Sequence, residues 1–135
     1  MHRIAATPGG WNPDTDGVII LDQTPAPIII LTAADTEIQT LAASLPQLPQ
    51  DFPQFRVASL LQLQQELSID TYVDSVLSKA KVIVVRLLGG RSYWSYGLER
   101  LREIAELYDI SLVVLPGDDR PDPVLCSLGT VPLTV

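Results

Sequence analysis

The segment from Arg86 to Gly97 carries the side chains of this sequence that are best suited to recognition or chemistry. It reads RLLGGRSYWSYG and combines arginines, a pair of glycines and three aromatic side chains. Glycine permits the close approach of another backbone or of a ligand. Aromatic faces beside charged groups suit a flat ligand with polar edges, or an interface with another domain. With carboxylates from other loops, the candidate site comprises Asp35, Arg86, Gly89, Gly90, Tyr93, Trp94, Tyr96, Asp118 and Asp119.

Four apolar segments are expected to position these residues. They begin near residues 28, 56, 82 and 111, and residues 82–85 (VIVV) form an unalternated β-branched run. Such a run is typical of a parallel strand that is covered on both faces. Helical patterns separate the segments, so the sequence predicts an α/β fold: a three-layer single domain with a mainly parallel sheet, flavodoxin-like or Rossmann-like. The carboxyl ends of its strands would bring the candidate residues to one rim.

The organisation of the chain follows from its proline, glycine and aspartate residues. Residues 1–27 are predicted to form an N-terminal loop with two short strand candidates, 2–6 and 18–21, whose pairing stays open. Residues 28–135 are predicted to form the α/β domain, and the whole chain is expected to be one structural domain. Asp35 and Asp70 are each predicted to N-cap a helix, and a further helix is expected to begin near Ser95.

The composition argues against several classes of protein. The 135 residues carry a net charge of −7, which disfavours a nucleic-acid surface built of clustered lysine and arginine. No apolar run approaches the length of a membrane span, and the N-terminus has no signal pattern, so a soluble, cytoplasmic protein is expected. Cys126 is the one cysteine, which excludes an internal disulfide and a paired-cysteine metal or redox site.

Common catalytic and nucleotide-binding motifs do not fit the sequence. The pair Gly89-Gly90 lacks the third glycine of a dinucleotide fingerprint, and no P-loop motif is present. A phosphoacceptor domain would end its central strand in an aspartate, where residues 87–88 are leucines. His2 has no ligand-type neighbour at zinc spacing and no motif that links it to Cys126. We therefore expect no catalytic residue and no metal ligand in this stretch, and no cofactor is assigned to it, while the binding role of the candidate residues stays open.

Four separated motifs occur in order along the chain. They are QTPAPIIILTAADTE (23–37), FRVASLLQL (55–63), KVIVVRLLGGRSYWSYGLERL (81–101) and LVVLPGDDRPDPVL (112–125). Together they resemble the N-terminal region of the large subunit of cobaltochelatase, the CobN family, which is related to the large H subunit of magnesium chelatase. The resemblance covers nearly the whole chain from about Gln23.

The resemblance implies a part in the insertion of cobalt into a corrin precursor of cobalamin. In that family the large subunit binds the tetrapyrrole, and separate AAA+ subunits hydrolyse ATP with magnesium. The large subunit is many times longer than this chain, so the residues of metal insertion are expected elsewhere in it. The resemblance thus implies a non-catalytic N-terminal domain. Its partners would be the remainder of the large subunit, the AAA+ subunits and the tetrapyrrole substrate.

Other functions stay open on the residues alone. The rim groups could have structural tasks only, since Asp35 can cap a helix and Asp118 and Asp119 can shape a turn. The scaffold also suits a free-standing flavodoxin-like module for flavin or another small ligand, although the loop after residue 31 lacks the Ser/Thr/Gly cluster that usually cradles phosphate. A third function is a pure assembly module, whose rim is buried against other domains.

Overall fold

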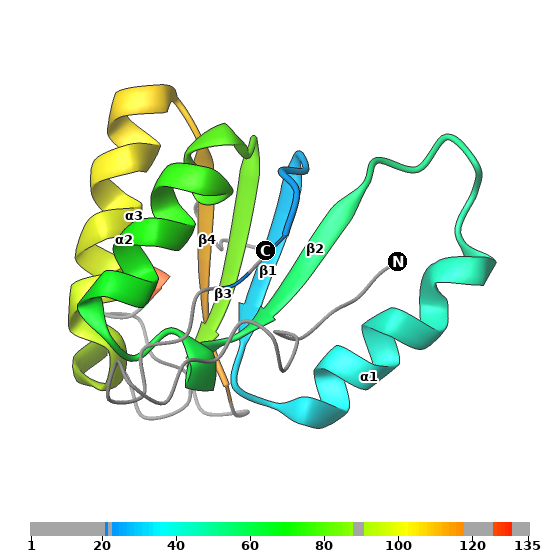
Figure 1. Ribbon diagram of the computed structural model, residues 1–135, viewed down its shortest axis with the longest axis horizontal. Helices are drawn as coiled ribbons and strands as arrows, with labels where there is room; N and C mark the ends of the chain where they lie inside the picture. The colour runs from blue at the N-terminus through cyan, green and yellow to red at the C-terminus, as the bar shows by residue number, and fades with distance from the viewer. Residues whose placement is uncertain (1–20, 22, 88–90, 118–125, 131–135) are drawn as a thin grey trace.

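Strands and helices alternate along the chain in a computed structural model that describes residues 21, 23–87, 91–117 and 126–130 (Figure 1). The strands are β1 (Ile28–Thr32), β2 (Phe55–Ser59), β3 (Val82–Leu87) and β4 (Ser111–Pro116). The helices are α1 (Asp35–Ser44), α2 (Glu66–Ser75) and α3 (Ser95–Tyr108). The positions that the sequence predicts for the four strands are confirmed, as is the start of the helix at Ser95.

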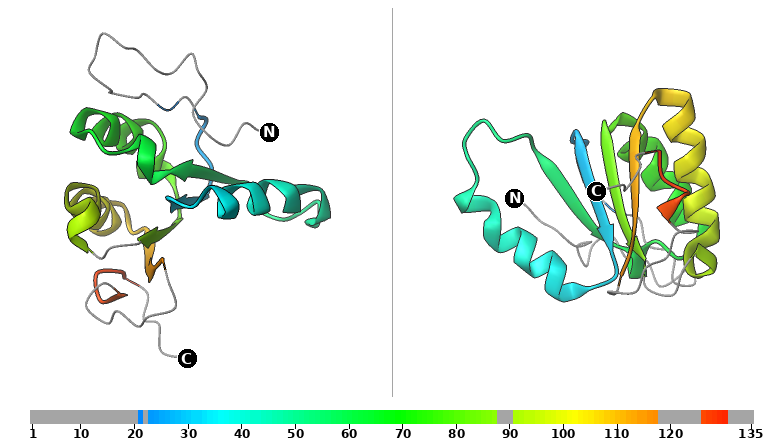
Figure 2. Two further views of the ribbon diagram at one scale, coloured as in Figure 1. Left: turned by 90° about the horizontal axis from the view of Figure 1, so that it is seen from below. Right: turned by 180° about the vertical axis from the view of Figure 1, so that it is seen from behind.

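The described strands form one sheet in the order β2-β1-β3-β4, and every pairing is parallel. In this register Ile28 lies opposite both Phe55 and Val82, and Val82 lies opposite Ser111. A flavodoxin-like sheet begins with this order, so the predicted α/β fold is confirmed. The strand order reverses between β1 and β3, and α1 accordingly lies on one face of the sheet while α2 and α3 lie on the other (Figure 2).

The face of the sheet beneath α2 and α3 holds the hydrophobic core. Alternate strand residues point to it, and the following are at most 1% exposed: Ile29, Leu31, Ile83, Val85, Leu87, Leu112 and Val114. The two helices contribute buried side chains at helical spacing: Ile69, Tyr72, Val73, Leu98, Leu101 and Ile104. Burial of one large apolar side chain contributes about 1.5–3 kcal/mol, so this layer is the main source of stability.

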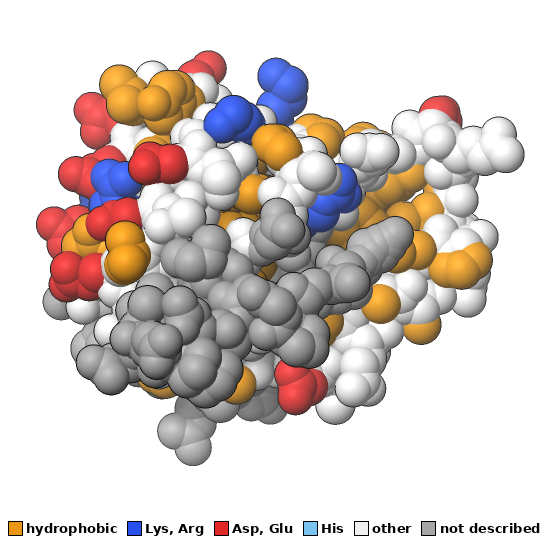
Figure 3. All heavy atoms as spheres, viewed as in Figure 1, with side chains coloured by type: hydrophobic (Ala, Val, Ile, Leu, Met, Phe, Trp, Pro, Cys, Tyr) orange, Lys and Arg blue, Asp and Glu red, His pale blue; other side chains and the backbone are white. Residues whose placement is uncertain are grey.

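The opposite face of the sheet is covered less completely. The intervening strand residues point to it, and seven apolar ones are half-buried: Ile28, Ile30, Phe55, Val82, Val84, Val113 and Leu115. These seven residues are called the open face below. Among the described helices α1 alone lies on this side, and its contacts are with β1 and β2 (Figure 2). Hydrophobic side chains are visible between β2 and α1 in Figure 3.

At the start of α1, the backbone N–H groups are not capped by the side chain that was predicted. The N-cap residue is Ala34, and no side-chain cap bond is formed. The Ala34 N–H donates instead to the hydroxyl of Thr32, at 3.2 Å. The last residue of β1 thus satisfies the N–H of the N-cap residue, while Asp35, which was predicted to be the cap, is the first residue of the helix and is exposed.

α2 begins before its predicted cap. Its N-cap residue is Gln65, so Asp70 lies inside the helix. There the Asp70 carboxylate accepts hydrogen bonds from Tyr96 and Arg100 of α3. The aspartate that was interpreted as a cap therefore joins two helices. The apolar stripe predicted for this segment is confirmed as buried: Val73, Val76, Leu77 and Ala80.

The chain on either side of the sheet is bonded to it. Before β1, the Tyr72 hydroxyl donates to Gln23 Oε1 at 2.5 Å, and Gln23 Nε2 donates to the Val57 carbonyl at 3.1 Å. After β4, the Thr130 N–H donates to the Leu112 carbonyl at 2.8 Å. The predicted strand at 2–6, most of that at 18–21, and residues 118–125 lie outside the described residues. None of the described helices has the length and apolar content that a membrane crossing requires.

Candidate functional site

The carboxyl ends of β1 and β3 lie where the strand order reverses, which is the usual place for a site in an open α/β sheet. Thr32 and Arg86 are opposite each other in the register at these two ends. Glu37, in the first turn of α1, reaches both of them. We call Thr32, Glu37 and Arg86 the rim cluster. Its position follows directly from the topology, because β1 leads into α1 and pairs with β3.

The rim cluster satisfies its own polar groups. The Thr32 hydroxyl donates to Glu37 Oε1 at 2.5 Å, and the Arg86 guanidinium forms an ion pair with the Glu37 carboxylate. A second guanidinium nitrogen of Arg86 donates to the Gly117 carbonyl at 3.1 Å. The side chains of Arg86 and Glu37 are 36% and 28% exposed, so water can reach both. The cluster is neutral as a unit and fastens α1 to the ends of β3 and β4.

A hollow of about 390 Å³ lies beside the rim cluster, between α1 and the sheet. Its lining is mainly apolar and hydroxyl-bearing: Ile30, Thr32, Thr36, Glu37, Thr40, Leu41 and Arg86. Since the one arginine and the one glutamate in this lining are paired, the hollow offers no free charge to a ligand. It suits an uncharged, partly apolar group that can accept or donate a hydrogen bond at its edge.

Trp94 is part of the hydrophobic core. Its side chain is buried, and its indole N–H donates to the Leu63 carbonyl at 2.7 Å. The ring packs against Gly97 in the first turn of α3. A Cβ atom at that position would come within 2.2–2.4 Å of three indole carbons. Glycine at residue 97 is therefore required by the ring, because any larger residue would have to displace it.

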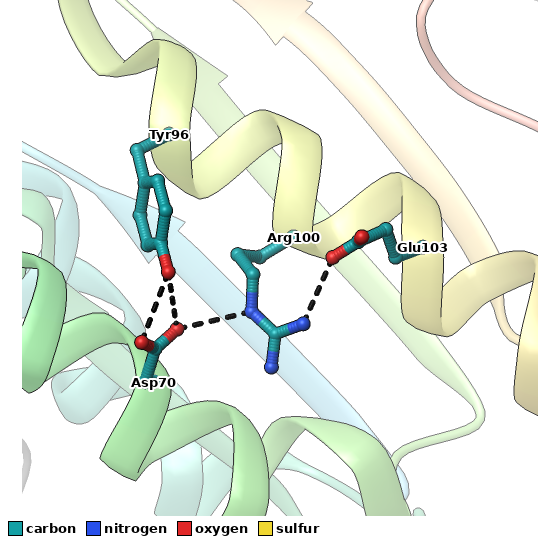
Figure 4. Close-up of polar contacts among 4 residues, drawn as sticks. All are labelled: Asp70, Tyr96, Arg100 and Glu103. Carbon is teal, nitrogen blue, oxygen red and sulfur yellow. Dashed lines mark hydrogen bonds and ion pairs between the residues drawn. The ribbon is translucent and has the colours of Figure 1, made fainter.

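Tyr96 takes part in a polar contact between α2 and α3 (Figure 4). Its hydroxyl donates to the Asp70 carboxylate, at 2.8 and 2.9 Å from the two oxygens. Arg100 donates to the same carboxylate at 3.0 Å and to Glu103 at 2.8 Å. The hydrogen bond to Asp70, together with desolvation and the charge of the carboxylate, raises the pKa of Tyr96. The contact aligns two helices and leaves the phenol protonated at neutral pH.

The structure thus distributes the predicted site residues over different environments. Arg86 belongs to the rim cluster, Asp35 is exposed at the start of α1, and Tyr93 is 44% exposed. Trp94 and Tyr96 have partners inside the domain. Four further candidates lie outside the described residues: Gly89, Gly90, Asp118 and Asp119.

The sequence interpretation missed Glu37, the partner of Arg86. A signal was present, because Glu37 lies five residues after the end of β1 and on the first turn of the following helix. In a parallel sheet that turn passes over the carboxyl end of the neighbouring strand. Within the described part of the chain, no three His, Cys, Asp or Glu side chains come close enough together to hold a metal ion.

Comparisons with known proteins identify the relatives of this chain. No protein-family model matches it. The aerobic cobaltochelatase subunit CobN of Pseudomonas aeruginosa is 46% identical over 132 residues, which cover 98% of this chain. CobN of a Sinorhizobium species is 44% identical over 131 residues, or 97% of the chain.

This chain is homologous to a part of CobN. It spans 10% of the length of each of these curated relatives. Among solved structures, the catalytic subunit of cobaltochelatase from Mycobacterium tuberculosis matches 77% of this chain and 8% of its own, with a TM-score of 0.58 and 22% identity. At that identity the structural match shows a shared fold. The resemblance to CobN inferred from the four sequence motifs is confirmed.

Proposed function

We propose that this chain is the N-terminal, non-catalytic domain of the large subunit of an ATP-dependent cobalt chelatase, and that its task is assembly. The complete enzyme would insert cobalt into a corrin precursor during cobalamin biosynthesis, while AAA+ partner subunits hydrolyse ATP. The supporting observation is the match to CobN, at 46% identity over 98% of this chain. Because the chain spans a tenth of that relative, the residues of metal insertion are expected in the remainder of the subunit.

The burial and hydrogen bonding of Trp94 and Tyr96 favour a role in assembly over binding of the macrocycle. Trp94 is buried and bonded to a backbone carbonyl, and Tyr96 is bonded to Asp70. The Trp94 ring is therefore not available to stack on a flat ligand, and the Tyr96 hydroxyl already has a partner. The hollow beside α1 has a volume of about 390 Å³, which accommodates side chains or the edge of a macrocycle rather than a whole tetrapyrrole.

Contact with the edge of the tetrapyrrole is the second candidate function. Tyr93 supports it, because this residue is 44% exposed and lies two residues before the start of α3. A free-standing flavin-binding function has less support. Asp35 adds an exposed carboxylate to the first turn of α1, where Glu37 is already paired with Arg86, and negative charge at this helix end opposes the binding of a phosphate.

Deletion of residues 1–135 from the full-length large subunit tests the proposal. We expect the shortened subunit to lose its stable complex with the AAA+ partners, measured by size-exclusion chromatography, and to lose cobalt insertion as a consequence. Addition of the 135-residue chain should restore both. If the shortened subunit assembles normally but binds the corrin precursor more weakly, contact with the tetrapyrrole is the function. If assembly, macrocycle binding and insertion are all unchanged, both functions are wrong.

A further inference from the structure

The open face has less cover than a parallel sheet requires. Ile30, Val84 and Val113 lie in one row across β1, β3 and β4, and all three are half-buried. Adjacent strand residues on the other face are fully buried. Sheets whose strands are all parallel are almost always covered on both faces, because their side chains are apolar on both. Among the residues that the structure describes, this row of apolar side chains therefore lacks the covering layer that a parallel sheet normally has on each face.

Elements within the described residues do not supply that cover. α1 packs mainly against β1 and β2, and at its first turn Glu37 reaches Arg86 at the end of β3 (Figure 2). The segment 126–130 lies on the other side, where Leu128 packs against the core and, with Thr130, lines a cavity beside α3. In the described part of the chain, no helix therefore lies over the part of the open face on β3 and β4: Val82, Val84, Val113 and Leu115.

The charge on this side of the sheet indicates the chemistry of the occupant. Arg86 is the charged strand residue of β3, and it is already paired with Glu37 and bonded to the Gly117 carbonyl. The surface next to it is apolar and ends at the hollow lined by Ile30 and Leu41. A matching partner presents aliphatic side chains without a compensating charge, as the apolar stripe of an amphipathic helix does.

We propose that a helix from the remainder of the large subunit packs on the open face across β3 and β4 and completes the third layer of the domain. This inference rests on the proposed function, since this chain spans 10% of CobN and the occupant would come from the rest of that polypeptide. A segment of the same polypeptide has an effective concentration of the order of millimolar through a short linker. It therefore competes favourably with a second copy of the domain for the same face.

The accessibility of a cysteine at residue 113 tests this packing. The variant Val113→Cys is prepared with Cys126→Ser, both in the 135-residue chain and in the full-length subunit, and its reaction with a maleimide is timed. The matched control is Leu107→Cys, because Leu107 lies on the outer side of α3 and is 72% exposed. We expect Val113→Cys to react at least about tenfold more slowly in the full-length subunit than in the short chain. Leu107→Cys should react at the same rate in both.

The outcomes separate this inference from the proposed function. Equal reaction rates of Val113→Cys in the two forms would overturn the docking of a helix on this face, even if deletion of residues 1–135 abolishes assembly. Protection of Val113→Cys would support it, even if the deletion leaves assembly with the AAA+ subunits unchanged. Protection that appears in the short chain alone and rises with its concentration, together with a dimer in light scattering, would assign the face to a second copy and refute the proposed occupant.

Discussion

The contact between Gly97 and Trp94 gives the sharpest test of the packing, because two opposing effects decide the sign of Gly97→Ala. In a helix, replacement of glycine by alanine normally stabilises by about 0.5–1 kcal/mol. Here the new methyl group would lie 2.2–2.4 Å from indole carbons of a buried ring. Forcing a methyl group into a packed core typically costs about 1–3 kcal/mol. The overlap is severe enough to place the packing cost at the upper end of that range, about 3 kcal/mol, from which the helix-propensity gain of about 0.5–1 kcal/mol is subtracted.

We therefore expect Gly97→Ala to lower the free energy of unfolding by about 2 kcal/mol. For a chain of this length each kcal/mol corresponds to about 3–5 °C, so the melting temperature should fall by about 6–10 °C. Urea unfolding followed by circular dichroism and a thermal melt both report the change. Arg102 is exposed in the same helix, so the pair Arg102→Ala and Arg102→Gly measures the helix-propensity term without the ring.

A double-mutant cycle isolates the role of the ring. Trp94→Ala removes the indole, so Gly97→Ala in that background should stabilise by about 0.5–1 kcal/mol, as at an open helical site. The sign of the alanine effect is then reversed between the two backgrounds. If Gly97→Ala stabilises the wild-type chain by the amount that the Arg102 pair gives, the ring does not occupy the space over residue 97, and the account of Trp94 as a core residue is refuted.

Three further perturbations test other contacts. Thr32→Val preserves the shape of a buried side chain but leaves the Ala34 N–H and the Glu37 carboxylate without its hydroxyl, and urea unfolding should show a loss of about 1–3 kcal/mol; a loss below the error of the measurement would contradict the rim cluster. Asp70→Asn should cost less than about 1 kcal/mol, because the ion pair with Arg100 is partly exposed; a larger loss would mean that the pair is shielded from water. Burial raises the pKa of Tyr72, so the unfolded chain ionises first and stability should fall above about pH 10, by up to about 1.4 kcal/mol per pH unit. Tyr72→Phe should reduce that slope in urea titrations at alkaline pH, and an unchanged slope would show that this phenol does not set it.

The architecture could be predicted from sequence because its main signal is local. Each strand is a short apolar run between turn residues, and the run from Val82 to Val85 shows no alternation, as expected of a strand with apolar side chains on both faces. Helices between such runs leave few topologies other than a parallel sheet. The buried positions of the stripe from Val73 to Ala80 could be predicted for the same reason, although α2 itself ends at Ser75 and a short 3-10 helix, Leu77–Lys79, follows it.

The candidate site was harder to predict because aromatic and charged residues serve two kinds of role. Trp94 and Tyr96 lie shortly after a pair of glycines, in a segment whose composition is typical of a recognition loop, yet one ring enters the core and the other residue, in α3, contacts α2. Asp70 is a residue type that often caps helices, but its carboxylate contacts Arg100 of α3. These partners lie about 26–31 residues away in sequence, and local patterns contain no information on contacts at that separation.

The central place of β1 in the sheet has a consequence for how the polypeptide is made. Both neighbours of β1 follow it in the chain, so β1, the first of the described strands, waits for β2 before one of its edges can pair and for β3 before the other edge can pair. During that interval a run of isoleucines is exposed to the cellular milieu, where chaperones or premature aggregation compete for it. An expression boundary placed downstream of Thr32 would remove the axis of the sheet and leave β2 separated from β3, whereas trimming near residue 23 would spare it.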